Sequence, residues 1–191
     1  RANTGSYKEF IELIRKNPGK LDYASAGAGS VHHLAGELFK QQTKTSITHI
    51  PYRGAAPALQ DVMGGQVPCM FLDLAAGLPV ITSGKVRALA IGSAKRVAAL
   101  PDVPTLAEAG VPNTEVFAFQ GILAPASLPA AITTRLNTDL NKALLNPAVV
   151  KRMNDFGMEA LPGTPEQFRA MARAESKRWG EIIKAAGVKL D

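Results

Sequence analysis

The stretch Ala24-Ser25-Ala26-Gly27-Ala28-Gly29-Ser30-Val31-His32-His33-Leu34 decides the fold of this chain. It has the pattern of a strand end, a turn of small residues and the start of a helix. Free backbone N–H groups at such a turn, together with the positive end of the helix dipole, suit carboxylate or phosphate oxygens. The sequence therefore predicts that a ligand carrying an anionic group binds at residues 27–30.

The segments on either side of this turn alternate between helical and strand patterns. Ser6 and Glu9 form a capping box before an apolar stripe that the Asn17-Pro18-Gly19 run ends. Further elements are expected as strands at 21–26, 45–52, 67–73 and 86–93 and as helices from Val31 on, at 56–63 and at 75–83. Strands that alternate with helices over short loops favour a mostly parallel α/β sheet, which binds ligands at the carboxyl ends of its strands.

The second half of the chain is mostly helical. Prolines interrupt residues 101–112 and leave a short helix at 105–110, and a long strand at 115–125 is predicted to cross between two lobes. Helices follow at 128–145 and 147–156, and a last one runs from the Thr164 capping box to Gly187. Their apolar faces need a sheet, yet little strand sequence lies near them. Either they pack on the first lobe, or part of the molecule lies outside this chain.

Composition narrows the class of protein. The 191 residues are 46% hydrophobic and 20% charged, and no apolar run approaches the roughly 20 residues of a membrane helix. The net charge of +6 comes from scattered basic residues with only 6% aromatics, which argues against nucleic acid and favours attraction of acidic ligands. The single cysteine, Cys69, cannot form an internal disulfide and is expected as a small core residue.

Several side chains near the expected strand ends are candidates for ligand contact. Ser30 is the N-cap of its helix and offers a hydroxyl and an N–H. His33 either contacts the ligand or makes a structural hydrogen bond, while His32 is expected to face solvent. Arg53 either pairs with a carboxylate or is solvated. Asp73 either accepts a hydrogen bond from a ligand or caps the next helix, and Phe119 and Gln120 are expected as hinge or core residues more than as contacts.

Three other classes of function are open to these residues. A serine hydrolase would use Ser30, His33 and Asp73 as nucleophile, base and orienting group, but the Gly-x-Ser-x-Gly spacing is missing. A metal site at His32-His33 is disfavoured because adjacent helical residues point about 100° apart. A purely structural or interaction domain leaves the clustered small-residue turns unexplained.

The sequence resembles one known family along almost its whole length. The resemblance is carried by the runs Ser25-Ala26-Gly27-Ala28-Gly29-Ser30, His33-Leu34-Ala35-Gly36-Glu37-Leu38-Phe39, Ile50-Pro51-Tyr52-Arg53-Gly54-Ala55-Ala56-Pro57-Ala58-Leu59, Gly64-Gly65-Gln66-Val67, Gly84-Lys85-Val86-Arg87-Ala88-Leu89-Ala90 and Leu100-Pro101-Asp102-Val103-Pro104-Thr105-Leu106-Ala107-Glu108-Ala109-Gly110. In these runs the sequence resembles the Bug or TctC-like family, the solute receptors of tripartite tricarboxylate transporters. The resemblance implies a periplasmic, two-lobed α/β protein of the type II periplasmic-binding-protein kind, with parallel-rich sheets flanked by helices.

The resemblance also implies boundaries and a function. Residues 1–116 resemble the second lobe, 117–125 the crossing or hinge strand, and 126–191 helices that return to a first lobe whose N-terminal part is expected to be absent here. Family members capture small carboxylates without chemistry or cofactor and hand them to a membrane permease. The ligand-binding residues implied for this half are Ser25, Gly27, Ala28, Gly29, Ser30 and His33. Two positions depart from the family pattern: Ala28 lies where a polar residue is frequent, and Phe71-Leu72-Asp73 replaces a frequent Phe-Asp-Asn run.

Overall fold

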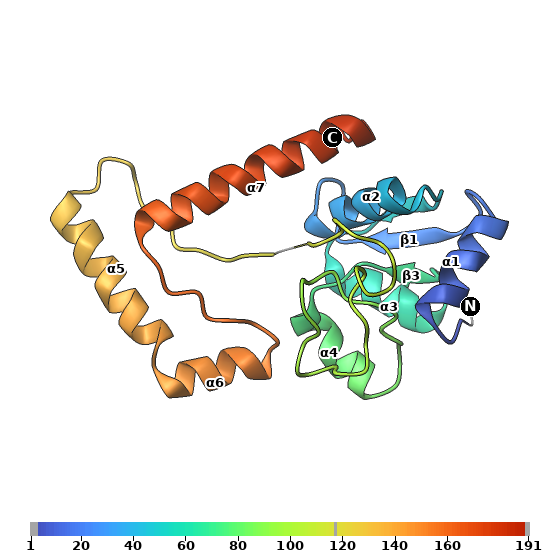
Figure 1. Cartoon of the computed structure of the whole chain (residues 1–191), viewed down its shortest axis with the longest axis horizontal. Coiled ribbons are helices and arrows are strands. Elements are labelled where there is room, and N and C mark those ends of the chain that lie inside the picture. The colour runs from blue at the N-terminus through green and yellow to red at the C-terminus, as the bar shows by residue number, and fades with distance from the viewer. Residues whose placement is uncertain (1–3, 117, 190–191) are drawn as a thin grey trace. The chain divides into compact units, whose positions relative to one another are not determined.

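The computed structural model describes residues 4–116 and 118–189 (Figure 1). Backbone contacts divide the chain into two compact units, one formed by residues up to Ala118 together with those from Glu181 on, the other by Phe119–Gly180. The described elements are α1 (Tyr7–Lys16), β1 (Asp22–Ser25), α2 (Val31–Thr43), β2 (Thr48–Pro51), α3 (Ala55–Gly64), β3 (Cys69–Met70), α4 (Leu74–Thr82), α5 (Ala130–Leu144), α6 (Pro147–Asp155) and α7 (Pro165–Ala186). The predicted boundaries of lobes and hinge remain a prediction, and Phe117, inside the expected crossing strand, lies outside the described residues.

The first unit is built on a parallel sheet of three strands in the order β2-β1-β3. β1 is central because the chain crosses to one side through α2 and then back past β1 through α3. Right-handed crossovers in opposite directions place their helices on opposite faces of the sheet, as α2 and α3 show in Figure 1. The predicted parallel α/β fold is confirmed.

Two hydrophobic clusters cover the two faces of this sheet. On one face Tyr23 packs with Phe10 and Ile14 of α1 and Phe39 of α2. On the other face Ala24, the next residue of β1, packs with Ala58 and Val67. Successive strand residues point to opposite faces, so adjacent positions Tyr23 and Ala24 belong to different clusters. Every side chain of β1 on the Tyr23 face therefore points toward α2, and this face includes Ser25.

Capping predictions hold at both ends of the chain. The Ser6 hydroxyl accepts a hydrogen bond from the Glu9 N–H at 3.3 Å at the start of α1. At α7 the box is reciprocal, because Thr164 Oγ1 accepts from the Gln167 N–H at 3.2 Å and Gln167 Oε1 accepts from the Thr164 N–H at 2.8 Å. Cys69 is a partly buried core residue as expected, and burial raises the pKa of its thiol to about 12.

Three expected elements are wrong. The segment 86–93 forms an isolated bridge between Ile91 and Thr105 and no strand, and Pro104 beside this bridge has no N–H to extend a ladder. Residues 105–110 form turns that end at Gly110 with φ 88°, so the helix there does not continue. The described part of 115–125 forms no strand, and the expected strands 45–52 and 67–73 shorten to β2 and β3.

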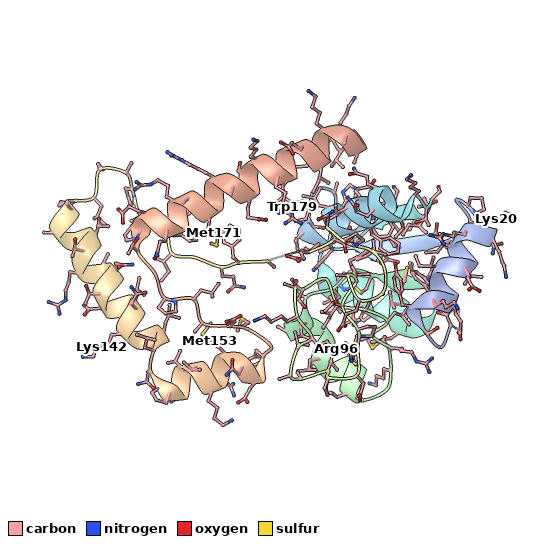
Figure 2. All side chains as sticks on the ribbon, in the orientation of Figure 1. Lys20, Arg96, Lys142, Met153, Met171 and Trp179 are labelled. Carbon is pink, nitrogen blue, oxygen red and sulfur yellow. The ribbon has the colours of Figure 1, made fainter. Side chains whose placement is uncertain are left out.

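The second unit consists of the crossing segment and helices α5, α6 and most of α7. A Cβ added at Gly121 would overlap the Phe168 ring of α7, and Phe119 meets the same ring edge to face at 5.9 Å. Met153 of α6 and Met171 of α7 lie on the inner sides of their helices (Figure 2). The apolar face of α5 stays open, with Ile132 and Leu136 each 47% exposed. No strand is assigned among the described residues of this unit, so the choice between packing on the first lobe and a sheet outside this chain stays open.

None of the helices in the described part of the chain is both long enough and apolar enough to span a bilayer.

Candidate functional site

The turn between β1 and α2 lies at the carboxyl edge of the sheet. Gly27 and Gly29 have φ values of 131° and 72°, which side chains rarely adopt, so glycine is required there by the backbone path. A backbone hydrogen bond from the Gly54 N–H to the Ala26 carbonyl, 3.2 Å long, joins this turn to the one after β2. The two turns and the N-termini of α2 and α3 therefore form one continuous rim.

Three of the backbone N–H groups of this turn donate hydrogen bonds to acceptors within the protein. The Gly27 N–H donates to Ser25 Oγ at 3.1 Å, the Gly29 N–H donates to His33 Nδ1 at 3.1 Å, and the Ser30 N–H donates to the Gly27 carbonyl at 3.2 Å. Within residues 4–116 and 118–189, no acceptor is found for the N–H groups of Ala28, Val31 and His32. These three N–H groups are the donors that the turn leaves available.

Ser30 acts as the expected N-cap. Its Oγ accepts a hydrogen bond from the His33 N–H at 3.2 Å. Because Oγ is the acceptor, the hydroxyl hydrogen of Ser30 stays available to donate to an anion. The cap bond uses the oxygen of this hydroxyl and leaves its hydrogen for a second partner.

Beneath the turn lies a pair of stacked imidazoles. The His33 ring of α2 and the His49 ring of β2 are 3.7 Å apart and 8° from parallel. His49 Nε2 lies 2.6 Å from Oγ of Ser25, whose residue is 0% exposed. His33 therefore makes the structural hydrogen bond that was one of its two expected roles, and the Ser25 hydroxyl is committed to the turn and to His49.

A charged cluster lies behind the imidazole pair. Glu37 of α2 accepts hydrogen bonds from the Tyr23 hydroxyl at 2.8 Å and from Lys40 Nζ at 2.7 Å. The nearer Glu37 oxygen lies 3.7 Å from His33 Nε2. Burial raises the pKa of Tyr23 well above its usual range, with the Glu37 carboxylate adding to the shift. Tyr23 thus stays a neutral donor that fixes the Glu37 carboxylate.

Both stacked histidines are held neutral. Burial is the main cause that lowers the pKa of His33, and Lys40 acts in the same direction while Glu37 opposes it. Burial lowers the pKa of His49 to about 4, and the neighbouring His33 ring contributes. A neutral His33 is required by the geometry as well, because Nδ1 can accept from the Gly29 N–H only through a free lone pair.

His32 is not exposed to solvent, so its expected position was wrong. It is buried at 6% exposure because α2 packs this side of its first turn toward the segment that follows β3. Its Nε2 donates to Oδ2 of Asp73 at 2.8 Å, and this bond lowers the pKa of the Asp73 carboxyl. Asp73 takes the N-cap position of α4 but makes no side-chain cap bond.

The three side chains of the hydrolase alternative, Ser30, His33 and Asp73, do not form a catalytic triad. Asp73 pairs with His32 and not with His33, while the Ser30 hydroxyl accepts from the His33 backbone and not from its ring. In the part of the chain that the structure describes, no cluster of three or more His, Cys, Asp or Glu side chains could hold a metal ion.

Arg53 lies exposed in the turn between β2 and α3. No ion pair or hydrogen bond of its side chain is found among the described residues. Its neighbour Tyr52 donates from its hydroxyl to Asp61 at 2.7 Å, and the Gly54 N-cap makes no side-chain hydrogen bond. The turn thus presents a free guanidinium beside an uncapped helix N-terminus.

Sequence reasoning missed His49, Tyr23 and Glu37. Alternation along β2 could have placed His49 on the α2 face, since Tyr23 and His49 are register partners. The i, i+4 spacing of His33 and Glu37 places both on one side of α2. Nothing local in the sequence indicates that these two patterns meet.

Comparison with known proteins matches this sequence to one family. The family model described as the tripartite tricarboxylate transporter family receptor matches residues 3–188. The chain belongs to this receptor family. Protein BugT of Bordetella pertussis is 36% identical over 97% of this receptor, which covers 57% of BugT. A protein encoded in the tcbD-tcbE intergenic region of Pseudomonas sp. strain P51 is 38% identical over 92% of this receptor and 52% of that protein.

Solved structures of similar proteins share the fold. An R. palustris protein with adipate has a TM-score of 0.89 at 35% identity, covering 97% of this receptor and 62% of that chain. The periplasmic binding protein BugD has a TM-score of 0.85 at 36% identity, covering 99% and 64%. MatC from Rhodopseudomonas palustris with bound malate has a TM-score of 0.80 at 32% identity, covering 96% and 63%. The receptor thus has the fold of periplasmic solute-binding proteins and spans about half the length of the two curated relatives named above.

Proposed function

We propose that this receptor captures a small organic carboxylate at the turn between β1 and α2 and performs no chemistry on it. The observation that carries the proposal is that the N–H groups of Ala28, Val31 and His32, at the N-terminus of a helix of 13 residues, find no acceptor among the residues described. A carboxylate placed there meets backbone donors and the positive end of the helix dipole without any reorganisation of side chains.

Side chains on both sides of this turn extend the proposed site. β1 is the central strand, so the turn after β2 with Arg53 and the turn after β3 with Asp73 flank it at the same edge. Arg53 suits a second carboxylate of the ligand, and Asp73 suits a hydroxyl or ammonium group. Ser30 contributes its hydroxyl hydrogen and Gly27 and Gly29 keep the approach open, while Ser25 and His33 support the turn from inside.

The chemistry of similar proteins agrees with this ligand class. The R. palustris protein was solved with adipate and MatC with malate, both small dicarboxylates. We further propose that the whole protein works in the periplasm and delivers its ligand to the permease of a tripartite transporter, with residues 1–116 as the ligand lobe, 117–125 as the hinge and 126–191 as helices of the other lobe. Closure of two lobes would remove water from the bound carboxylate and create the surface that the permease recognises.

Calorimetry on the full-length protein tests the ligand class. We expect adipate, malate or another small dicarboxylate to release heat with a stoichiometry near one, and the corresponding diamides to release none. Gly29→Leu should abolish that heat because its side chain fills the approach to the turn. Retained affinity in a folded Gly29→Leu protein would place the ligand elsewhere, and turnover of an ester without carboxylate binding would favour a hydrolase.

A further inference from the structure

We propose that His49 is a positioning residue for the carboxylate site, which it serves from the neighbouring strand by orienting Ser25 and His33 under the glycine turn. This inference rests on the proposed function, because it assigns His49 to the turn that we expect to bind the ligand. His49 itself lies below the turn and contacts the two residues that hold the turn amides.

The first contact of His49 acts on Gly27. His49 Nε2 lies 2.6 Å from Ser25 Oγ, and the same Oγ accepts the Gly27 N–H at 3.1 Å. Oγ also lies 3.1 Å from the Gly27 carbonyl, to which it donates. With that hydrogen on the carbonyl, His49 is the donor that fills the remaining lone pair of Oγ. The position of Gly27 therefore depends on a bond that reaches across from β2.

The second contact of His49 acts on Gly29. The His49 ring stacks on the His33 ring with 3.7 Å between centroids and 8° between planes, and this contact fixes the orientation of the His33 ring. In that plane His33 Nδ1 accepts the Gly29 N–H at 3.1 Å. Between these two anchored amides stands the Ala28 N–H, which has no acceptor among the described residues. Fixing Gly27 and Gly29 therefore aims the Ala28 N–H at the ligand.

The groups around the stacked pair support this neutral arrangement. From α2, Glu37 lies 3.7 Å from His33 Nε2 and is itself bound by Lys40; from β1, the Tyr23 hydroxyl donates to Glu37 and its ring lies 5.1 Å from the His49 ring. The Glu37 carboxylate, too far for a hydrogen bond, favours the Nε2–H tautomer of His33 through its charge, and that tautomer leaves Nδ1 as the acceptor for Gly29. A proton added to His33 would remove that acceptor, so binding should weaken on acidification.

The test separates the two contacts with three variants of the full-length protein. His49→Gln keeps a polar group that reaches Ser25 but loses the aromatic stack. His49→Phe keeps the stack but loses the hydrogen bond, and His49→Ala loses both. Thr48→Val is the matched control, since Thr48 is the exposed neighbour of His49 on β2. Two readouts are measured: affinity for adipate and malate, and the backbone amide NMR signals of Gly27 and Gly29 without ligand.

We expect His49→Ala to weaken binding roughly tenfold or more, as the loss of one good hydrogen bond would do. His49→Phe should move mainly the Gly27 signal and His49→Gln mainly the Gly29 signal, a crossed pattern that general destabilisation does not produce. The Gly29 signal of the unmutated protein should also titrate with His33 at acidic pH, whether or not any variant folds.

Two results would overturn the inference. One is a His49→Ala protein that binds as tightly as Thr48→Val; the other is a pair of amide signals that respond alike to His49→Phe and His49→Gln. If the unmutated protein binds no carboxylate, the proposed function fails, whereas the ligand-free amide signals still decide whether His49 holds the turn.

Discussion

His32 Nε2 donates a hydrogen bond to Asp73 Oδ2 across 2.8 Å, and this bond joins the first turn of α2 to the segment that follows β3. The two partners differ in environment, because the His32 side chain is 7% exposed and the Asp73 side chain 46%. Loss of the bond costs more at His32 than at Asp73, because a buried polar atom without a partner cannot form a hydrogen bond with water instead.

Removal of the Asp73 carboxylate should therefore destabilise the protein through His32. We expect Asp73→Ala to lower the free energy of unfolding by about 1–2 kcal/mol, because the buried Nε2–H loses its acceptor. Asp73→Asn should cost less than half of that, because its amide oxygen still accepts. Urea denaturation of both variants measures the difference, and equal losses would mean that the charge of Asp73 matters and the hydrogen bond does not.

A second prediction concerns Gly36, on the face of α2 that meets β1. A Cβ added there would overlap the Tyr23 ring, whose hydroxyl donates to Glu37. Gly36→Ala should cost about 1–3 kcal/mol as an overpacked core substitution. The matched control is Gly180→Ala in α7, where a Cβ meets open space and should stabilise the helix by roughly 0.5–1 kcal/mol. The temperature of thermal unfolding should fall for Gly36→Ala and rise for Gly180→Ala.

Acid should weaken the fold through the stacked histidines. Their pKa values are lowered in the folded protein, to about 4 for His49, so the unfolded chain binds protons first as the pH falls. Stability from these groups is complete above their unfolded pKa near 6.5 and declines as the pH falls toward about 4. Unfolding temperatures measured from about pH 7 to about pH 4.5 should fall less steeply for His49→Gln than for the unmutated protein. Parallel curves would show that His49 is not responsible.

The positive charge of Arg53 at the carboxyl edge of the sheet should affect ligand affinity and not the stability of the fold. Arg53 follows β2 at the carboxyl edge, while the exposed Lys20 precedes β1 at the opposite edge, where its side chain extends away from the ribbon (Figure 2). Arg53→Gln should weaken dicarboxylate binding roughly tenfold by removing a charged donor. Lys20→Gln, which removes the same charge, should leave the affinity within about twofold. Calorimetry at low and moderate salt distinguishes a direct ion pair from general attraction.

Local patterns predicted the capped helix starts and the glycine turn. The capping boxes at Ser6 and Thr164 and the glycine turn before Ser30 depend on hydrogen bonds within a few residues, so the sequence around each is enough. The failed strands depend on a partner instead. Residues 86–93 have strand composition, yet a strand forms only where a neighbour offers N–H groups, and Pro104 offers none.

The site shows the same division between local and distant causes. Ser30 was placed correctly because an N-cap is a property of its own helix. His32 was placed wrongly because its burial depends on Asp73, 41 residues away in the chain. The position of Arg53 at the rim followed from the strand pattern, whereas its lack of a partner among the described residues is visible only in the folded chain.

By itself, the sequence determined that a strand, a small-residue turn and a capped helix follow one another at residues 22–43, because glycine φ angles and capping hydrogen bonds are set by adjacent residues. Only the tertiary structure decided which side chains support that turn. The crossover through α2 brings β2 alongside β1, and this register places His49 against Ser25 and beneath His33. Contacts of this kind depend on how separate elements pack, and packing is settled by the whole core at once.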